Sequence, residues 1–238
     1  MTDEAALRAN LDHVLQRMAN AAGRAHRAPE GVRLIAVTKG QPAEVVRMAH
    51  AAGMRDVGEN RVEEALPKQA ALADLSDLRW HLVGHLQSRK ASAVPGAFVL
   101  VHSIDRPKIA AILDRRAAER GLRMPALLEC NVSGEATKAG WDARPSADRD
   151  ALVEALRAAA RLPNLEVGGL MTMAPWTRDE GELRSVFRRL RELRDECAAG
   201  GDRWPELSMG MTDDFELAIE EGATMVRIGR ALFGERLE

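Results

Sequence analysis

The first segment of the chain carries apolar residues at the spacing of an amphipathic helix. Five of them fall on one face of a 3.6-residue period: Leu7, Leu11, Val14, Leu15 and Met18. Thr2 or Asp3 can cap the start of this helix, because side-chain oxygens at that position accept hydrogen bonds from free backbone N–H groups. We therefore expect residues 1–27 to form an N-terminal helix that packs on the rest of the protein.

Beyond residue 27, short apolar runs alternate with amphipathic stretches to the end of the chain. Eight runs have the length of β-strands: residues 33–38, 55–58, 80–84, 98–102, 126–132, 166–171, 206–209 and 225–228. Six stretches between them have the spacing of helices: residues 42–52, 61–73, 107–120, 147–161, 179–199 and 213–221. A regular alternation of eight strands with helices predicts an α/β fold, namely a (β/α)8 TIM barrel with an additional N-terminal helix.

A doubly wound open sheet is the alternative α/β fold for this pattern. Such a sheet normally has a glycine-rich phosphate-binding turn after its first strand. Here the first strand is followed by Thr-Lys-Gly-Gln-Pro at residues 38–42, which is neither a G-x-G-x-x-G turn nor a P-loop. The sequence also shows no linker, low-complexity tract or internal repeat. We therefore predict a single barrel domain over residues 1–238.

The composition indicates a folded protein that binds neither membranes nor nucleic acids. The 238 residues are 46% hydrophobic and 29% charged, and a formal net charge of −2 argues against a dedicated nucleic-acid binder. No apolar run approaches the roughly 18 residues of a membrane span, and the acidic N-terminus differs from a signal peptide. Cys130 and Cys197 form no C-x-x-C pair, which favours free thiols in a reducing compartment. We expect a cytoplasmic monomer.

Two residue counts restrict the chemistry that the chain can perform. It contains no tyrosine, so no phenol can serve as acid, base or nucleophile. Of its 34 basic residues, five are lysines, at positions 39, 68, 90, 108 and 138, and the rest are arginines. Because arginine does not form Schiff bases, amine chemistry is confined to those five side chains and the N-terminus.

Two basic residues stand out at the carboxyl ends of the strands, where TIM barrels place their active sites. Lys39 follows the first apolar run, so its amine should emerge into the barrel mouth, where partial desolvation favours the neutral amine that Schiff bases require. An ordinary solvated lysine is the alternative. Arg227 lies within the last strand, where alternation points it inward together with Gly229, opposite to Val226 and Ile228. Since a buried charge needs a partner, Arg227 predicts an internal salt bridge or a bound ligand.

Two loops near the end of the chain have the composition of a phosphate site. Residues 208–212, Ser-Met-Gly-Met-Thr, precede a helix that opens at Asp213, and such turns present free backbone N–H groups. Gly229 and Arg230 offer a second set before the last short helix. TIM barrels often bind phosphate between the loops after strands seven and eight. The two loops together therefore predict a phosphate-binding position.

Other motifs point to no further chemistry. His81 and His85 have the i, i+4 spacing of zinc ligands on a helix, but they bracket a strand end, and no H-E-x-x-H motif accompanies them. We therefore predict no metal site. Glu59, Glu63 and Glu64 have the pattern of a solvated helix start. The chain has no G-x-S-x-G elbow and no cysteine with an evident histidine partner, so hydrolase chemistry gains little support.

Seven sequence blocks in register carry a resemblance to a known family. They are AVTKGQP (36–42), VGENRVEEA (57–65), WHLVGHLQSRK (80–90), NVSGEATKAG (131–140), GLMTM (169–173), LSMGMTDDFELAI (207–219) and TMVRIGRALFG (224–234). Together they resemble the pyridoxal-phosphate homeostasis protein family. Its members are single barrels similar to the N-terminal domain of alanine racemase, and they bind pyridoxal 5′-phosphate (PLP).

The resemblance implies roles for nine cofactor-binding residues and for no catalytic residue. Lys39 looks like the lysine that holds PLP as a Schiff base, Asn60 would lie near the cofactor ring, and Arg227 would face the pyridine nitrogen. Six residues of the two loops would surround the phosphate: Ser208, Gly210, Met211, Thr212, Gly229 and Arg230. Gly40 and Arg89 depart from residues common in the family, which puts only loop conformation in doubt.

The implied function is homeostasis of intracellular PLP, or vitamin B6, by a protein that holds the cofactor on Lys39 and releases it to PLP-dependent apoenzymes. An arginine at the pyridine nitrogen stays protonated and makes PLP a poorer electron sink. Alanine racemase works despite such an arginine because a lysine and a tyrosine act as two bases, and this chain has no tyrosine. The resemblance therefore favours a carrier without turnover.

Two alternatives remain open at the level of sequence. The first is a PLP-dependent, racemase-like enzyme acting on amino acids, with His85 or Cys130 as its second base. The second is an unrelated barrel enzyme for a phosphorylated metabolite, which would leave Lys39 and the sequence blocks unexplained. The sequence also leaves open whether Lys138 is a second, transient PLP site.

Overall fold

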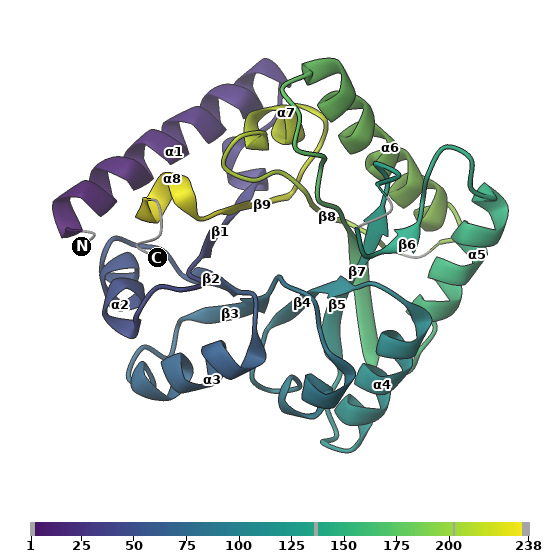
Figure 1. The fold of residues 1–238 in the computed structure, drawn as a ribbon, viewed down its shortest axis with the longest axis horizontal. Coiled ribbons are helices and arrows are strands. Elements are labelled where there is room, and N and C mark those ends of the chain that lie inside the picture. Colours follow the sequence, from purple (N-terminus) through teal and green to yellow (C-terminus); the bar gives the residue numbers. More distant parts are fainter. Residues whose placement is uncertain (1–2, 136–137, 202, 235–238) are drawn as a thin grey trace.

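The computed structural model, which describes residues 3–135, 138–201 and 203–234, confirms the predicted barrel. Its strands are β1 (Arg33–Val37), β2 (Asp56–Glu59), β3 (Arg79–Leu82), β4 (Leu100–Ile104), β5 (Met124–Asn131), β6 (Trp141–Asp142), β7 (Leu165–Met171), β8 (Glu206–Ser208) and β9 (Met225–Ile228). All pair in parallel. Because β1 pairs with both β2 and β9, and β4 pairs with β5, the sheet closes on itself (Figure 1). Only the two-residue β6, beside the end of β5, was not predicted.

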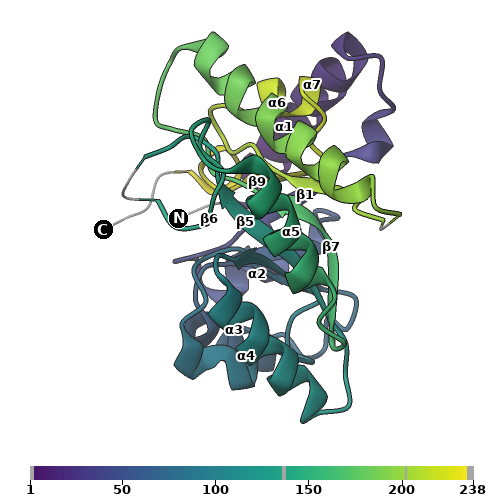
Figure 2. The same ribbon diagram turned by 90° about the vertical axis from the view of Figure 1, so that its right-hand side faces the viewer.

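The helices surround the strands. They are α1 (Glu4–Arg24), α2 (Ala43–Ala51), α3 (Val62–Ala71), α4 (Pro107–Ala118), α5 (Arg149–Ala160), α6 (Glu180–Ala198), α7 (Phe215–Glu220) and α8 (Arg230–Phe233). Figure 2 shows helices on both sides of the strands. A 3₁₀ helix, η1 (Pro29–Gly31), precedes β1, and a second, η2 (Ser88–Ala93), connects β3 to β4, where the sequence pattern predicted no helix. No helix within the described residues is both long and apolar enough to span a membrane.

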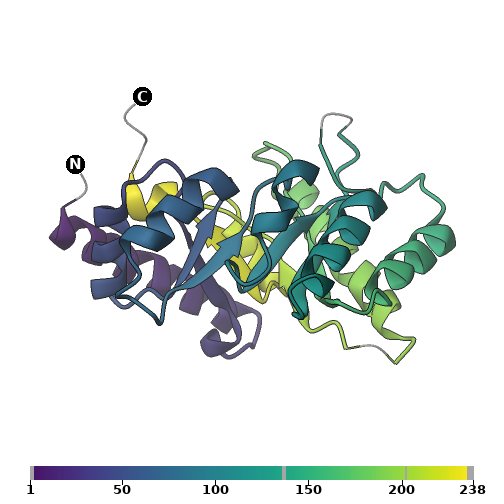
Figure 3. The ribbon, with the colours of Figure 1, turned by 90° about the horizontal axis from the view of Figure 1, so that it is seen from below.

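Helix α1 is the predicted N-terminal helix. The Asp3 carboxylate caps it by accepting a hydrogen bond of 2.8 Å from the Ala5 backbone N–H. Its apolar face packs against α7 and α8, and α1 and α8 lie at the opposite end of the molecule from α5 (Figure 3). Leu15 departs from the prediction and is 45% exposed, because it falls at the edge of the buried stripe.

The apolar core has two layers. The larger layer lies between the strands and the helices. The smaller one fills the barrel interior: Ile35, Val83, Leu100, Leu127, Met171 and Met225. By strand alternation, five buried polar residues share that inner face: His81, His102, Glu129, Ser208 and Arg227. The interior is therefore apolar in part and ionisable in part.

Candidate functional site

A cavity of about 420 Å³ opens at the carboxyl ends of the strands. This volume lies within the usual range for small-molecule sites. The cavity is lined by seven of the nine predicted site residues: Lys39, Asn60, Met211, Thr212, Arg227, Gly229 and Arg230. Ser208 and Gly210 do not line it. Segments from β1, β2, β8 and β9 thus meet at one position, although they are far apart in the sequence.

Ser208 lies deeper than the loop that follows it. Its side chain is completely buried. The hydroxyl oxygen accepts a hydrogen bond of 2.7 Å from Arg227 and lies 2.8 Å from Nδ1 of His102. The structure therefore places Ser208 behind Arg227 in the barrel interior and not among the residues that line the cavity.

Gly210 shapes the turn between β8 and α7. Its φ of +94° lies in the region that side chains other than glycine rarely adopt. A Cβ atom here would also lie 2.6 Å from Cβ of Ala218 and 2.9 Å from Cα of Phe215. Glycine is thus required for the backbone turn that presents Met211 and Thr212 to the cavity.

The two predicted phosphate loops come together. The Ala231 backbone N–H donates a hydrogen bond of 3.4 Å to the Thr212 hydroxyl, and Arg230 forms an ion pair with Asp213. Gly229 allows a close approach to β1, because a Cβ atom there would lie 3.3 Å from the Val37 carbonyl oxygen. The loops after β8 and β9 therefore form one side of the cavity, next to the end of β1.

A buried ionic network holds the backbone on both sides of Lys39. Lys68, from α3, donates hydrogen bonds to the Thr38 carbonyl oxygen (2.9 Å), to Glu59 (2.7 Å) and to Glu64 (3.0 Å). The Thr38 hydroxyl donates a hydrogen bond of 2.6 Å to Glu59, and the backbone N–H of Gly40 donates a hydrogen bond to Glu64. The residues before and after Lys39 are thus fixed by the same three charged side chains.

The prediction that three glutamates form a solvated helix start is wrong for Glu59. Its carboxylate is fully buried at the end of β2, because Lys68 reaches back from the second turn of α3 to meet it. Burial raises the pKa of Glu59, although Lys68 and Thr38 oppose this. Its Oε2 atom has no hydrogen-bond partner among the described residues. Glu63, by contrast, is about half exposed, as predicted.

Arg227 points into the barrel, as alternation along β9 predicts. Its guanidinium donates to the Ser208 hydroxyl and, over 2.9 Å, to the Thr172 carbonyl oxygen. Val226 and Ile228 belong to the outer apolar layer. Burial lowers the pKa of Arg227 to about 10, so the side chain remains protonated at neutral pH. Its hydrogen-bond partners among the described residues are thus a hydroxyl and a backbone carbonyl and not a carboxylate, so of the two alternatives the internal salt bridge is not found.

Glu129, which was not predicted from the sequence, and His85, the candidate second base, line the same cavity. Glu129, on the inner face of β5, is buried, and this burial raises its pKa to about 7. The available signal in the sequence was a charged residue within an otherwise apolar strand, the same signal that identified Arg227. His85 lines the cavity mouth, and its Nδ1 atom lies 2.9 Å from the buried carboxylate of Asp105.

Cys130 and Lys138 lie outside the lining. Burial raises the pKa of the Cys130 thiol well above its ordinary value, and the side chain packs in the outer apolar layer. Lys138 forms an ion pair with Glu135 and donates to the Met173 carbonyl oxygen over 3.2 Å. Within the described part of the chain, no group of three or more His, Cys, Asp or Glu residues is placed to hold a metal ion.

Met173, Met211 and Trp176 form an exposed apolar rim on the cavity. Trp176 is the most exposed of these, at 88%.

Comparisons with known proteins place these features in a family context. The alanine racemase N-terminal domain matches residues 3–237. A protein from Aquifex aeolicus is 44% identical over 95% of this chain and 96% of its own, and one from Pseudomonas aeruginosa is 48% identical over 95% and 94%. Both are called pyridoxal phosphate homeostasis protein. The solved structure of PipY from Synechococcus elongatus with PLP bound is 40% identical, with a TM-score of 0.80, and the match covers 93% of this chain and 100% of that one.

Proposed function

Because the chain belongs to the pyridoxal phosphate homeostasis protein family, within the alanine racemase N-terminal domain group, we propose that it binds PLP in the cavity at the strand ends and serves intracellular PLP homeostasis. The observation that carries this proposal is the meeting of Lys39, Arg227 and the two predicted phosphate loops in one cavity. A homologue 40% identical with PLP bound supports it.

The residues of the cavity fit the chemistry of PLP. When bound, PLP supplies an aldehyde that reacts reversibly with a lysine amine, with loss of water. Lys39 is the lysine in the lining, and Asn60 lies on the neighbouring strand end. The loops that carry Thr212 and Gly229 provide the position for the phosphate. We propose all nine predicted residues as the binding site, with Ser208 and Gly210 acting from behind the lining.

We propose that the protein is a carrier and not an enzyme. Arg227 remains protonated at neutral pH, and a cation that faces the pyridine nitrogen keeps that nitrogen unprotonated. The bound cofactor then withdraws electrons weakly, which disfavours reactions that pass through a carbanion. Hydrolysis of the link to Lys39 needs no such withdrawal, so holding and releasing PLP remain possible.

Borohydride reduction followed by peptide mass mapping tests the binding proposal. The wild-type protein mixed with PLP should show visible Schiff-base absorbance, and reduction should fix a pyridoxyl group on Lys39. Lys39→Ala should abolish both signals, whereas Lys108→Ala, at an exposed lysine of α4, should leave them unchanged. Absence of absorbance in the wild type would overturn the proposal, and a label on Lys138 would show that the wrong lysine was chosen.

The racemase-like enzyme remains a second candidate because of His85. Asp105 contacts Nδ1 of this ring, which leaves Nε2 as the nitrogen available to the cavity. Such a histidine can move a proton, whereas the buried Cys130 lies outside the lining. Exchange of the Cα hydrogen of amino acids in deuterated water tests this candidate. Exchange that is catalysed by the PLP-loaded protein and lost in His85→Gln would favour the enzyme, and background exchange would favour the carrier.

We further propose that residues 1–238 act as one PLP-binding unit, monomeric and cytoplasmic, that passes PLP to recipient apoenzymes. Cys130 and Cys197 are both buried free thiols, as suits a reducing compartment. Sedimentation at micromolar concentration tests the monomer. Recovery of activity by a PLP-free enzyme, faster with the loaded protein than with the same amount of free PLP, tests the transfer.

A further inference from the structure

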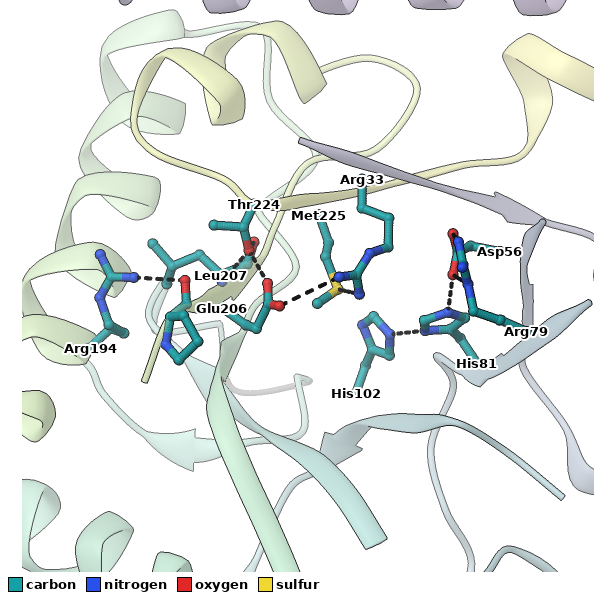
Figure 4. Close-up of polar contacts among 11 residues, drawn as sticks. Arg33, Asp56, Arg79, His81, His102, Arg194, Glu206, Leu207, Thr224 and Met225 are labelled. Carbon is teal, nitrogen blue, oxygen red and sulfur yellow. Dashed lines mark hydrogen bonds and ion pairs between the residues drawn. The ribbon is translucent and has the colours of Figure 1, made fainter. Parts of the chain in front are cut away.

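A row of buried polar side chains crosses the barrel interior from Arg227 toward the amino-terminal ends of the strands. Arg227 donates to the Ser208 hydroxyl oxygen over 2.7 Å, and this oxygen lies 2.8 Å from Nδ1 of His102. Nε2 of His102 lies 3.0 Å from Nδ1 of His81, and Nε2 of His81 lies 2.9 Å from Asp56. Figure 4 shows the part of this row that runs from His102 to Asp56. The row links the cavity wall to the opposite end of the barrel.

The far end of the row is a carboxylate. Arg79 donates to both Asp56 oxygens, over 2.7 and 2.5 Å (Figure 4). Burial alone would raise the pKa of Asp56, but the hydrogen bonds from Arg79 and His81 outweigh it and hold the pKa well below its usual range. Asp56 is therefore ionised at neutral pH, and an ionised carboxylate can only accept hydrogen bonds.

This carboxylate determines which ring nitrogens carry hydrogen. Burial lowers the pKa of both His81 and His102, and Arg33, which lies beside the two rings, acts in the same direction (Figure 4). Asp56 opposes this for His81, but the pKa of that ring stays lowered. Each ring is thus neutral, with one donor and one acceptor nitrogen. His81 must donate to Asp56 through Nε2, so its Nδ1 accepts from Nε2 of His102. Nδ1 of His102 then accepts the hydroxyl hydrogen of Ser208.

Every hydrogen in the row is therefore donated away from the cavity, from Arg227 through to Asp56. We propose that Asp56, His81 and His102 are positioning residues of the cofactor site, which act through Ser208 to fix the orientation of the Arg227 guanidinium. The inference rests on the proposed function, in which Arg227 faces bound PLP. It also means that Ser208 has no hydroxyl hydrogen left for a phosphate, in contrast to the role that the resemblance implied.

Nuclear magnetic resonance of the wild-type protein without added PLP tests the row itself. Long-range ¹H–¹⁵N correlation spectra distinguish the two neutral forms of a histidine ring, and the spectra of His81→Gln and His102→Gln assign the signals. Both rings should be neutral at pH 7 with hydrogen on Nε2. Hydrogen on Nδ1 of either ring, or a doubly protonated ring, would overturn the proposed direction.

Visible absorbance of the PLP-loaded protein tests the positioning role. Asp56→Asn should shift the Schiff-base absorbance band, because the loss of the carboxylate frees the rings to exchange donor and acceptor nitrogens. Ser208→Ala cuts the row, so adding Asp56→Asn to Ser208→Ala should cause no further shift. If the shift of the double variant equals the sum of the shifts of the two single variants, or if Asp56→Asn causes no shift, the positioning role is overturned. His50→Gln, at the surface pair of His50 with Asp77, is the control and should leave the band unchanged.

The two measurements separate this inference from the proposed function. If the wild type binds no PLP, the proposed function fails, while the ring signals still report whether the row exists. If PLP binds at Lys39 and the substitutions act independently, the proposed function stands and the positioning role fails.

Discussion

The two basic residues of the cavity are supported in opposite ways. On the Lys39 side, the supporting groups are charged: Lys68 lies between Glu59 and Glu64 and bonds the backbone before Lys39. On the Arg227 side, the groups in direct contact are neutral, namely a hydroxyl and a backbone carbonyl, and the nearest partner carboxylate of the row lies beyond two imidazole rings.

The difference follows from what each residue must do. The Lys39 amine has to lose its charge to react with an aldehyde, so its supports fix the backbone of Thr38 and Gly40. Arg227 has to keep its charge, and a carboxylate in direct contact would cancel the field that it presents to the cavity. Neutral dipoles orient it without such cancellation. Four substitutions test this contrast, from the largest expected effect to the smallest.

Lys68→Met should produce the largest loss of stability. It removes the cation from a buried pair and leaves Glu59 uncompensated, which typically costs about 3–5 kcal/mol. Urea unfolding at pH 7 measures the change, with the exposed Lys108→Met as control. The double variant Lys68→Met with Glu59→Gln should recover part of the loss. A loss below about 1 kcal/mol in the single variant would show that the charged network does not support the Lys39 side in the way described.

Glu129→Gln should make stability less dependent on pH. The pKa of Glu129 is raised from 4.5 to about 7, so the folded protein holds this proton more tightly than the unfolded chain. Wild-type stability should therefore fall relative to the variant as pH rises from 4.5 to 7, by about 3 kcal/mol in total. Thermal unfolding at several pH values measures the difference. The exposed Glu166→Gln should show no such trend, and parallel curves for wild type and Glu129→Gln would contradict the expectation.

On the Arg227 side, Asp56→Asn should lower the free energy of unfolding of the protein by about 2 kcal/mol at pH 7. This is the usual range for a buried hydrogen bond to a charged group. The pKa of Asp56 is depressed in the folded state, so its stabilising effect is present above the pKa of an unfolded aspartate and is lost as pH falls below it. The difference should therefore shrink below about pH 4. Asp142→Asn, at an exposed pair with Arg144, is the matched control and should change stability by less than about 1 kcal/mol.

Lys90→Met should have the smallest effect. Lys90 lies 3.8 Å from Glu63, and both side chains are solvated, so the pair should contribute about 0–0.5 kcal/mol. The same unfolding assay at low and high salt checks this. A loss as large as that of Lys68→Met would show that burial is not what distinguishes the two lysines.

The sequence predicted the barrel from the alternation of strands with helices along the chain, and the direction of Arg227 from the alternation of side chains within one strand. Strand alternation is a strict period of two, so Val226 and Ile228 on one face leave Arg227 on the other. Lys39 and the phosphate loops were placed by the rule that sites lie at strand ends, and they do line one cavity.

The structure differs from the prediction where a side chain turns toward a partner on another element of the fold. Glu59 is buried because Lys68 folds back onto it, and Ser208 turns inward to meet His102, which lies 106 positions earlier. Glu129 was overlooked although a charged residue within an otherwise apolar strand was visible in the sequence. No local period encodes such pairings, since they depend on the register between strands.

The exposed Trp176 gives the molecule a spectroscopic reporter. Because the chain has no tyrosine, its ultraviolet emission comes from four tryptophans, and the other three, Trp80, Trp141 and Trp204, are buried. Emission from the solvated indole at the cavity rim lies at longer wavelength than that of the buried ones, and it overlaps the absorbance of a PLP Schiff base. Energy transfer from this one indole would make arrival and departure of the cofactor visible in real time, without any label.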